Sequence, residues 1–180
     1  MASVGLFFGS DEGNSERIAY RIQKRFGEDI LDVIDIADAT QLDFTHYDNI
    51  ILGIPTWDFG QIQSDWDEFW NDISEVDFSG KTLAFFGLGD QFGYSDYFLD
   101  AMGMLHDVVI QSGPRVIGHW STEGYEFTAS KAEIPGAGKF VGLALDEDHQ
   151  EHLSADRLNR WCAQIHGEFG LDSSLNDVHD

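Results

Sequence analysis

The chain has 180 residues, of which 33 are Asp or Glu and 10 are Lys or Arg, so its formal net charge at pH 7 is −23. An anion of this size repels nucleic-acid phosphates and acidic membrane surfaces and attracts basic proteins instead. The length favours one domain, and a hydrophobic fraction of 42% is enough for a sizeable core. The single cysteine, Cys162, excludes an intramolecular disulfide, and no stretch reaches the roughly 18 apolar residues of a membrane helix. The N-terminus lacks the basic region of a signal peptide, so we expect a cytoplasmic protein.

Short apolar runs alternate along the chain with stretches of helical periodicity. The predicted strands are Val4–Phe8, Leu31–Ile36, Asn49–Ile54, Thr82–Leu88, Val116–His119 and Phe140–Ala144. The predicted helices lie around Ile18–Phe26, Trp66–Ile73, Tyr97–Gln111 and Leu158–Phe169, where apolar residues recur every three or four positions. Strands that are apolar almost throughout are typical of a parallel sheet covered on both faces. The alternation therefore predicts a doubly wound, three-layer α/β fold.

One segment interrupts this alternation. From Trp120 to Lys139 the chain is polar, contains Gly and Pro, and shows no clear period. A loop of this length within a compact domain is usually functional or an insertion. We expect a single domain over residues 1–171, followed by a frayed polar tail over residues 172–180.

The loops that follow the strands are the candidate site, because ligands of doubly wound folds bind beyond the carboxyl ends of the strands. The first of these loops, rich in Gly and hydroxyl groups, contains Ser10, Asp11, Glu12, Gly13, Asn14 and Ser15 and leads into the first helix. Free amides at a helix N-terminus, together with the helix dipole, suit a phosphate. The alternative is that Ser10, Asn14 or Ser15 only caps the helix. The loop matches neither the P-loop pattern nor the dinucleotide-binding pattern.

Two further loops place large aromatic residues at strand ends. The loop after the third strand contains Pro55, Thr56, Trp57, Asp58, Phe59 and Gly60, and the loop after the fourth contains Leu88, Gly89, Asp90 and Tyr94. A planar ligand stacked on Trp57, with Tyr94 as a second aromatic plate, would explain these positions. The alternatives are that Trp57 folds back as a lid with no ligand and that Tyr94 covers the sheet edge. An anion cradle beside two aromatic plates predicts a phosphorylated planar heterocycle, of which flavin mononucleotide (FMN) is the simplest candidate.

Several sequence blocks in this order resemble the long-chain flavodoxins. They are GLFFGS, ILGIPTWDFG, SGKTLAFFGLGDQFGYSDYFLDA, WSTEGYEFTAS, KFVGLALDEDHQ and the final helix that contains Trp161. The segment from Trp120 to Lys139 resembles the loop that this subgroup inserts into its last strand. PTWDFG and GLGDQ-x-GY are similar in particular to the second enterobacterial flavodoxin type.

The resemblance implies a five-stranded parallel sheet in the order 2-1-3-4-5 and a low-potential one-electron carrier that binds FMN non-covalently and turns over no substrate of its own. It implies a phosphate site at Ser10–Ser15, ribityl and ring contacts from Thr56 and Trp57, a stacking Tyr94, a ring edge lined by Leu88, Gly89 and Asp90, and a ribityl contact from Asp148. It also implies a monomer and redox partners with basic patches, such as a ferredoxin/flavodoxin-NADP reductase.

One residue departs from the family pattern. Glu12 stands where the family's phosphate loop usually has a Thr, so an acceptor-only anion replaces a donor. We therefore expect FMN to bind more weakly than to the usual loop. Alternative functions are an NAD(P)H quinone reductase of the same fold, a phospho-receiver domain, and a non-redox interaction module that has lost FMN. His149 and His152 lie in an acidic segment that we interpret as a solvated loop and not as a metal site.

Overall fold

The central sheet of the computed structural model, which describes residues 2–177, has five main positions in the order β2-β1-β3-β5-β10. These strands are β1 (Val4–Phe8), β2 (Leu31–Asp35), β3 (Asn49–Trp57), β5 (Thr82–Leu88) and β10 (Leu143–Leu145). Each neighbouring pair along this path is parallel. The predicted order 2-1-3-4-5 is confirmed, because the short β4 (Gln61–Ile62) only adds an antiparallel hairpin to the end of β3.

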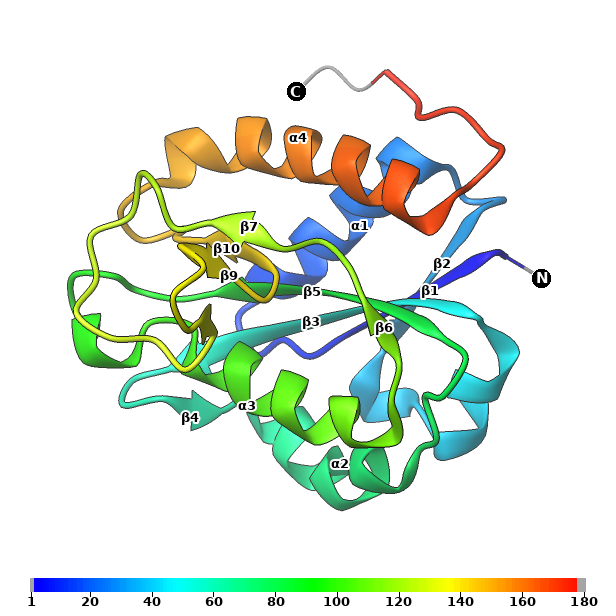
Figure 1. Cartoon of the computed structure of the whole chain (residues 1–180), viewed down its shortest axis with the longest axis horizontal. Helices are drawn as coiled ribbons and strands as arrows, with labels where there is room; N and C mark the ends of the chain where they lie inside the picture. Colours follow the sequence, from blue (N-terminus) through cyan, green and yellow to red (C-terminus); the bar gives the residue numbers. More distant parts are fainter. Residues whose placement is uncertain (1, 178–180) are drawn as a thin grey trace.

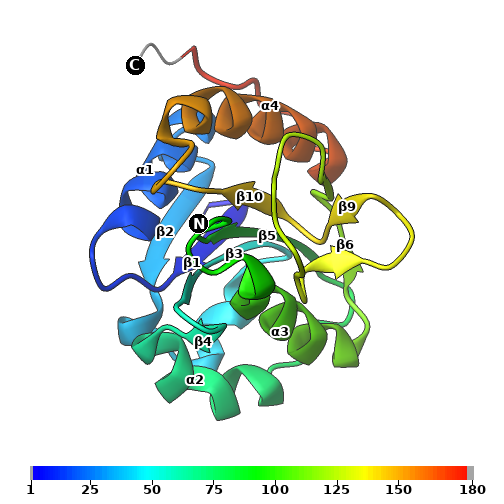
Figure 2. The ribbon, with the colours of Figure 1, turned by 90° about the vertical axis from the view of Figure 1, so that its left-hand side faces the viewer.

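Two helices cover each face of the sheet (Figures 1 and 2). One face carries α1 (Asn14–Phe26) and α4 (Glu151–Phe169), and the other carries α2 (Ser64–Glu75) and α3 (Asp100–Val109). Short 3-10 helices occupy Ile36–Asp38, Gln41–His46, Ser95–Tyr97 and Ile110–Ser112.

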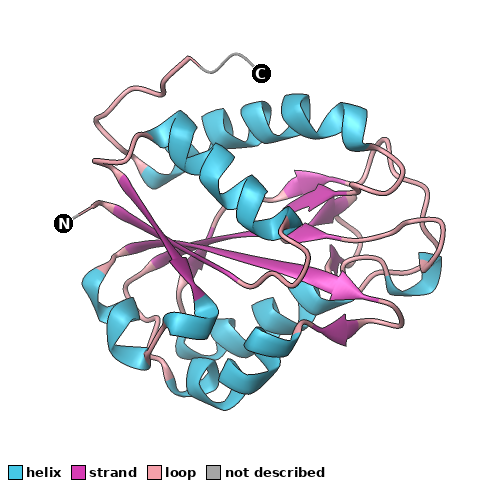
Figure 3. Cartoon of the chain, turned by 180° about the vertical axis from the view of Figure 1, so that it is seen from behind, coloured by secondary structure: helices cyan, strands magenta, loops and turns pink. Residues whose placement is uncertain are grey.

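The strands are buried between these helix layers, as the view from behind shows (Figure 3). Successive side chains of a strand point to opposite faces, so Phe7 joins the core under α2 and α3 while Leu6 and Phe8 join the core under α1 and α4. Both cores need apolar residues from the same strand. The strands are therefore apolar throughout, which is the pattern from which a parallel sheet was expected.

The fifth sheet position is divided by an insertion. Residues of β6 (Arg115–Val116) pair with the start of β5, and β10 pairs with its end. Between them, β7 (Trp120–Ser121), β9 (Lys139–Phe140) and β8 (Glu133–Ile134) form a small antiparallel sheet. The expected strands Val116–His119 and Phe140–Ala144 are thus wrong in extent, and the expected loop contains strands of its own.

Tyr125 fastens this insertion to the main sheet. Its hydroxyl donates to the carbonyl oxygen of Ala144 at 2.6 Å and accepts from Nε1 of Trp120 at 2.9 Å. Arg157 lies over the ring at 4.1 Å from its centroid. The insertion is therefore held to both β10 and α4.

Two elements near the site differ from their predicted extents. The third strand continues to Trp57 because β4 pairs with its end, at Thr56 and Trp57. The helix expected over Tyr97–Gln111 begins only at Asp100, because Leu99 has a left-handed backbone with φ 60°. The hydroxyl of Thr56 accepts from the amide of Ala101 at 3.0 Å and so helps to start α3.

The described part of the C-terminal tail, residues 172–177, has no helix or strand. The Asn176 amide donates to the carbonyl oxygen of Arg25 at 2.7 Å, which ties the tail to the end of α1. The predicted fraying concerns motion and stays a prediction, and residues 178–180 lie outside the described part. Within residues 2–177, no helix has the length and apolar content needed to cross a membrane.

Candidate functional site

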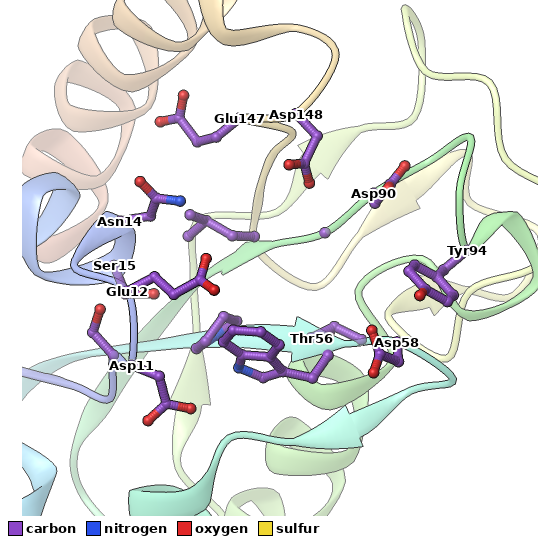
Figure 4. Close-up of a pocket in the computed structure, with 15 residues that line it drawn as sticks. Asp11, Glu12, Asn14, Ser15, Thr56, Asp58, Asp90, Tyr94, Glu147 and Asp148 are labelled. Atoms are coloured by element: carbon purple, nitrogen blue, oxygen red, sulfur yellow. The ribbon is translucent and has the colours of Figure 1, made fainter.

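A pocket lies at the carboxyl ends of β1, β3, β5 and β10, where the loops of the predicted site meet (Figure 4). Its volume is about 250 Å³, close to the lower end of the range for small-molecule sites. The lining residues are Ser10, Asp11, Glu12, Asn14, Ser15, Pro55, Thr56, Trp57, Asp58, Leu88, Gly89, Asp90, Tyr94, Glu147 and Asp148. All of them except Glu147 were predicted from the sequence. Their binding roles stay predictions, but the fold does bring them together.

The β1–α1 loop leaves the N-terminus of α1 open. Gly13 is the N-cap residue, with a left-handed φ of 88°, and no side chain caps the helix. The hydroxyl of Ser10 accepts from the Gly13 amide at 2.9 Å, within the loop itself. The capping role considered for Ser10, Asn14 and Ser15 is therefore absent from this structure.

Ser15 supplies the sharpest signal for a ligand in this loop. The residue lines the pocket but is only 1% exposed, and its Oγ has no hydrogen-bond partner. A buried hydroxyl without a partner is costly, so it marks a place where a ligand atom belongs. Together with the open N-terminus of α1, it forms a cradle of donors that suits a phosphate.

The β3–β4 hairpin carries the first aromatic plate. Trp57 lines the pocket at the end of β3, and its Nε1 is buried without a partner. The turn that follows has positive φ at Asp58 (41°) and Gly60 (87°). Glycine adopts this backbone freely, and Asp tolerates it better than most residues. The turn reverses the chain within three residues and leaves Trp57 at the pocket wall.

The second plate, Tyr94, is held by the same hairpin. Interaction of its hydroxyl with the carboxylate of Asp58 is the main reason that the pKa of Tyr94 is raised. The ring of Phe59 meets that of Tyr94 edge-on at 5.4 Å. These contacts join the two loops that present the aromatic side chains.

Three predicted residues do not line the pocket. Phe59 is 67% exposed and supports Tyr94 from outside, because the hairpin turn directs its ring away from the cavity. Gly60 and Gly13 shape their turns through positive φ and have no side chain to present. None of the three lines this pocket, and the prediction that Gly13, Phe59 and Gly60 contact the cofactor stays a prediction.

Acidic side chains surround the pocket: Asp11, Glu12, Asp58, Asp90, Glu147 and Asp148. Glu147 was not among the residues predicted from the sequence. Its side chain is only 7% exposed and lies 3.4 Å from a guanidinium nitrogen of Arg17, and burial raises its pKa. Its contact with Arg17 of α1 joins segments that are distant in the sequence, so no local sequence signal indicates it. Burial also raises the pKa of Asp148, with further contributions from Asp90 and Asp146.

Asp90, Asp146 and His149 bring metal-ligand atoms within 4.8 Å of one another. The oxygens of Asp146 already accept from amides of Gln91, Asp148 and His149 and from the Gln91 side chain. Nε2 of His149 lies 2.8 Å from Oδ1 of Asp90. This group is therefore a hydrogen-bonded link between the loops that follow β5 and β10.

Comparisons with known proteins agree with this fold. A family model described as Flavodoxin matches residues 6–161. The chain is 49% identical over 176 residues to Flavodoxin 1 of Escherichia coli (strain K12), covering 98% of this chain and 99% of the relative. It is 49% identical over 171 residues to a flavodoxin of Haemophilus influenzae, covering 95% and 98%. The crystal structure of Fusobacterium nucleatum flavodoxin bound to flavin mononucleotide superposes with a TM-score of 0.83 at 29% identity, covering 93% of this chain and 99% of that one. The likeness to the second enterobacterial type stays a prediction.

Proposed function

The chain belongs to the flavodoxin family, and from this premise we propose that it carries single electrons between proteins with non-covalently bound FMN. The observation that carries the proposal is the buried, unpartnered hydroxyl of Ser15 beneath the open N-terminus of α1, in the pocket that Trp57 and Tyr94 also line. That set offers donors to a phosphate and aromatic surface to a flat ring, which are the two chemical parts of FMN.

Each part of the pocket has a distinct task in this proposal. Ser15 and the first amides of α1 hold the phosphate, while Trp57 and Tyr94 shield the ring from water. When bound, FMN supplies redox chemistry, because its ring accepts and releases electrons one at a time. Leu88 and Gly89 lie along the ring edge, and the absence of a side chain at Gly89 lets its backbone pack against Phe98 and Leu99.

The surrounding carboxylates lower the potential at which the site accepts electrons. Six acidic residues line the pocket in a chain of net charge −23, so extra negative charge there is disfavoured. For a one-electron couple, about 59 mV corresponds to about 1.4 kcal/mol of such a penalty. Repulsion of this kind lowers the reduction potential of the bound flavin, so the reduced protein can donate electrons to acceptors whose own reduction potentials are low.

The protein acts in the cytoplasm as a monomer and has no substrate of its own. Its acidic surface steers it toward redox proteins with basic patches, such as a ferredoxin/flavodoxin-NADP reductase. The net charge of the chain supports the choice of basic partners. Tyr94 and Trp57 both line the pocket, whereas a quinone reductase would need one face of the flavin ring to be open, and this supports the absence of a substrate. No observation in the described chain favours the quinone reductase, the receiver domain or the cofactor-free module.

The test measures electron delivery to the FMN-loaded protein from a ferredoxin/flavodoxin-NADP reductase supplied with NADPH. We expect the association rate to fall as salt rises from 0.02 to 0.5 M, because screening weakens steering; these are about the ionic strengths at which the Debye length shrinks from roughly 20 to 4 Å. We also expect no quinone-dependent NADPH oxidation without the reductase. Quinone reduction by the protein alone would contradict the carrier role, and a rate that ignores salt would contradict electrostatic steering.

A further inference from the structure

Glu12 differs from the other acidic residue of the β1–α1 loop. The carboxylate of Asp11 accepts from Nε2 of Gln63 at 2.9 Å and from the Ser64 hydroxyl at 3.2 Å, so it is held toward the start of α2. Glu12 is exposed, and its carboxylate has no hydrogen bond or ion pair with residues 2–177. In Figure 4 it extends into the pocket, whereas the Asp11 carboxylate points away. Glu12 is therefore a free negative charge inside the proposed phosphate site.

No basic side chain in the described chain offsets this charge within the pocket, because none of the lining residues is Lys, Arg or His. Arg17 is the first basic residue after the loop. Its guanidinium is engaged by Oδ1 of Asn14 at 3.2 Å and by the Glu147 carboxylate at 3.4 Å, and Arg17 itself does not line the pocket.

The opposite wall adds to the repulsion. Asp148, on the loop between β10 and α4, lines the same pocket, and Glu12 is among the charges that raise its pKa. The carboxylates of Glu12 and Asp148 thus repel each other across the cavity. A phosphate that enters the cradle of Ser15 and the α1 amides adds a third anion to this pair.

We propose that Glu12 sets the flavin preference of the site by weakening the binding of phosphate-bearing FMN relative to phosphate-free riboflavin. This inference rests on the proposed function, because it requires a flavin in the pocket. Glu12 repels only the phosphate, while the aromatic plates act on the ring that both flavins share. FMN therefore binds less tightly, relative to riboflavin, than it would with an uncharged side chain at position 12.

The size of the effect follows from Coulomb's law. A carboxylate about 5 Å from one phosphate charge weakens binding by roughly five- to 150-fold, for effective dielectric constants between that of water and about 20. The solvent exposure of Glu12 places the expected effect toward the lower end of that range. Binding is weakened but not abolished.

The experiment compares dissociation constants of FMN and riboflavin for the wild-type apoprotein, Glu12→Gln and Glu16→Gln by fluorescence titration. Glu16 is the matched control, because it lies in the first turn of α1, is exposed and does not line the pocket. We expect Glu12→Gln to tighten FMN at least about fivefold and riboflavin less than about twofold. Glu16→Gln should change either constant by less than about twofold. The gain from Glu12→Gln should shrink in 1 M salt, where the Debye length is about 3 Å.

Three results would overturn the inference. An unchanged FMN constant in Glu12→Gln would show that the carboxylate does not oppose the phosphate. Equal tightening of FMN and riboflavin by Glu12→Gln would show that the carboxylate acts on the ring. Equal tightening of FMN by Glu16→Gln would show that only the net charge of the protein matters. These outcomes are distinct from failure of the proposed function, in which the wild-type protein would bind neither flavin.

Discussion

Ser15→Ala should affect the stability of the apoprotein and its affinity for FMN in opposite directions. In the apoprotein the Ser15 Oγ is buried and makes no hydrogen bond, so its removal costs the fold no interaction. A buried polar group without a partner carries a penalty of about 1–3 kcal/mol, part of which the variant recovers. The apoprotein of Ser15→Ala should therefore be as stable as the wild type or up to about 1 kcal/mol more stable.

The same substitution should weaken FMN. A hydrogen bond from a hydroxyl to a charged group contributes about 1.5–3 kcal/mol, which corresponds to roughly 13- to 160-fold in the dissociation constant. Because the α1 amides remain, binding should be reduced but measurable. The two effects have opposite signs, which no general loss of structure produces.

Urea unfolding of the apoprotein and fluorescence titration with FMN measure the two quantities. Ser154→Ala is the control for loss of a buried hydroxyl, because Ser154 is 2% exposed and lies on α4 outside the pocket. That control should leave the FMN constant within about twofold of wild type. FMN binding by Ser15→Ala as tight as that of wild type, or equal weakening of FMN binding by Ser154→Ala, would contradict a contact between Ser15 and the phosphate.

Further expectations concern the hairpin, the insertion and the core thiol. Asp58→Pro, which fixes φ near −65° where the structure has 41°, should weaken FMN by more than about tenfold, while Asp58→Gly should stay within about threefold; equal constants would contradict a role for this backbone. Tyr125→Phe removes the bonds to Trp120 and Ala144 and should lower the free energy of unfolding by about 1–3 kcal/mol in urea, and no change would show that the insertion is held elsewhere. Burial raises the pKa of Cys162 to about 12, so a thiol reagent at pH 8 should label it only in urea; rapid labelling of the native protein would refute this.

The sheet and the location of the site could be predicted because both depend on local pattern and simple geometry. Apolar runs such as those around Phe7 and Phe85 indicate strands buried on both faces, and parallel strands bring their following loops to one edge. Trp57 and Tyr94 were found because large aromatic residues in strand-end loops need an explanation. The resemblance supplied the strand order, which spacing alone does not determine.

Features set by contacts between distant segments were not predicted. Leu99 has a left-handed backbone, which leucine normally avoids, and its side chain is fully buried. The strands of the insertion are two residues long, so they carry no periodicity, and Tyr125 holds them through bonds to other segments. Phe59 lies outside the pocket, with its ring edge-on to that of Tyr94, and the sequence of the loop does not distinguish this position from one that lines the pocket.

Titration of FMN with the wild-type apoprotein tests the central claim most directly. If two aromatic side chains enclose the ring while the α1 N-terminus holds the phosphate, flavin fluorescence should fall to a plateau at one FMN per chain. Thermal unfolding should shift upward in the same samples, because a ligand that binds only the folded state stabilises it. Fluorescence that stays unquenched at excess protein, with no shift in unfolding temperature, would contradict the account.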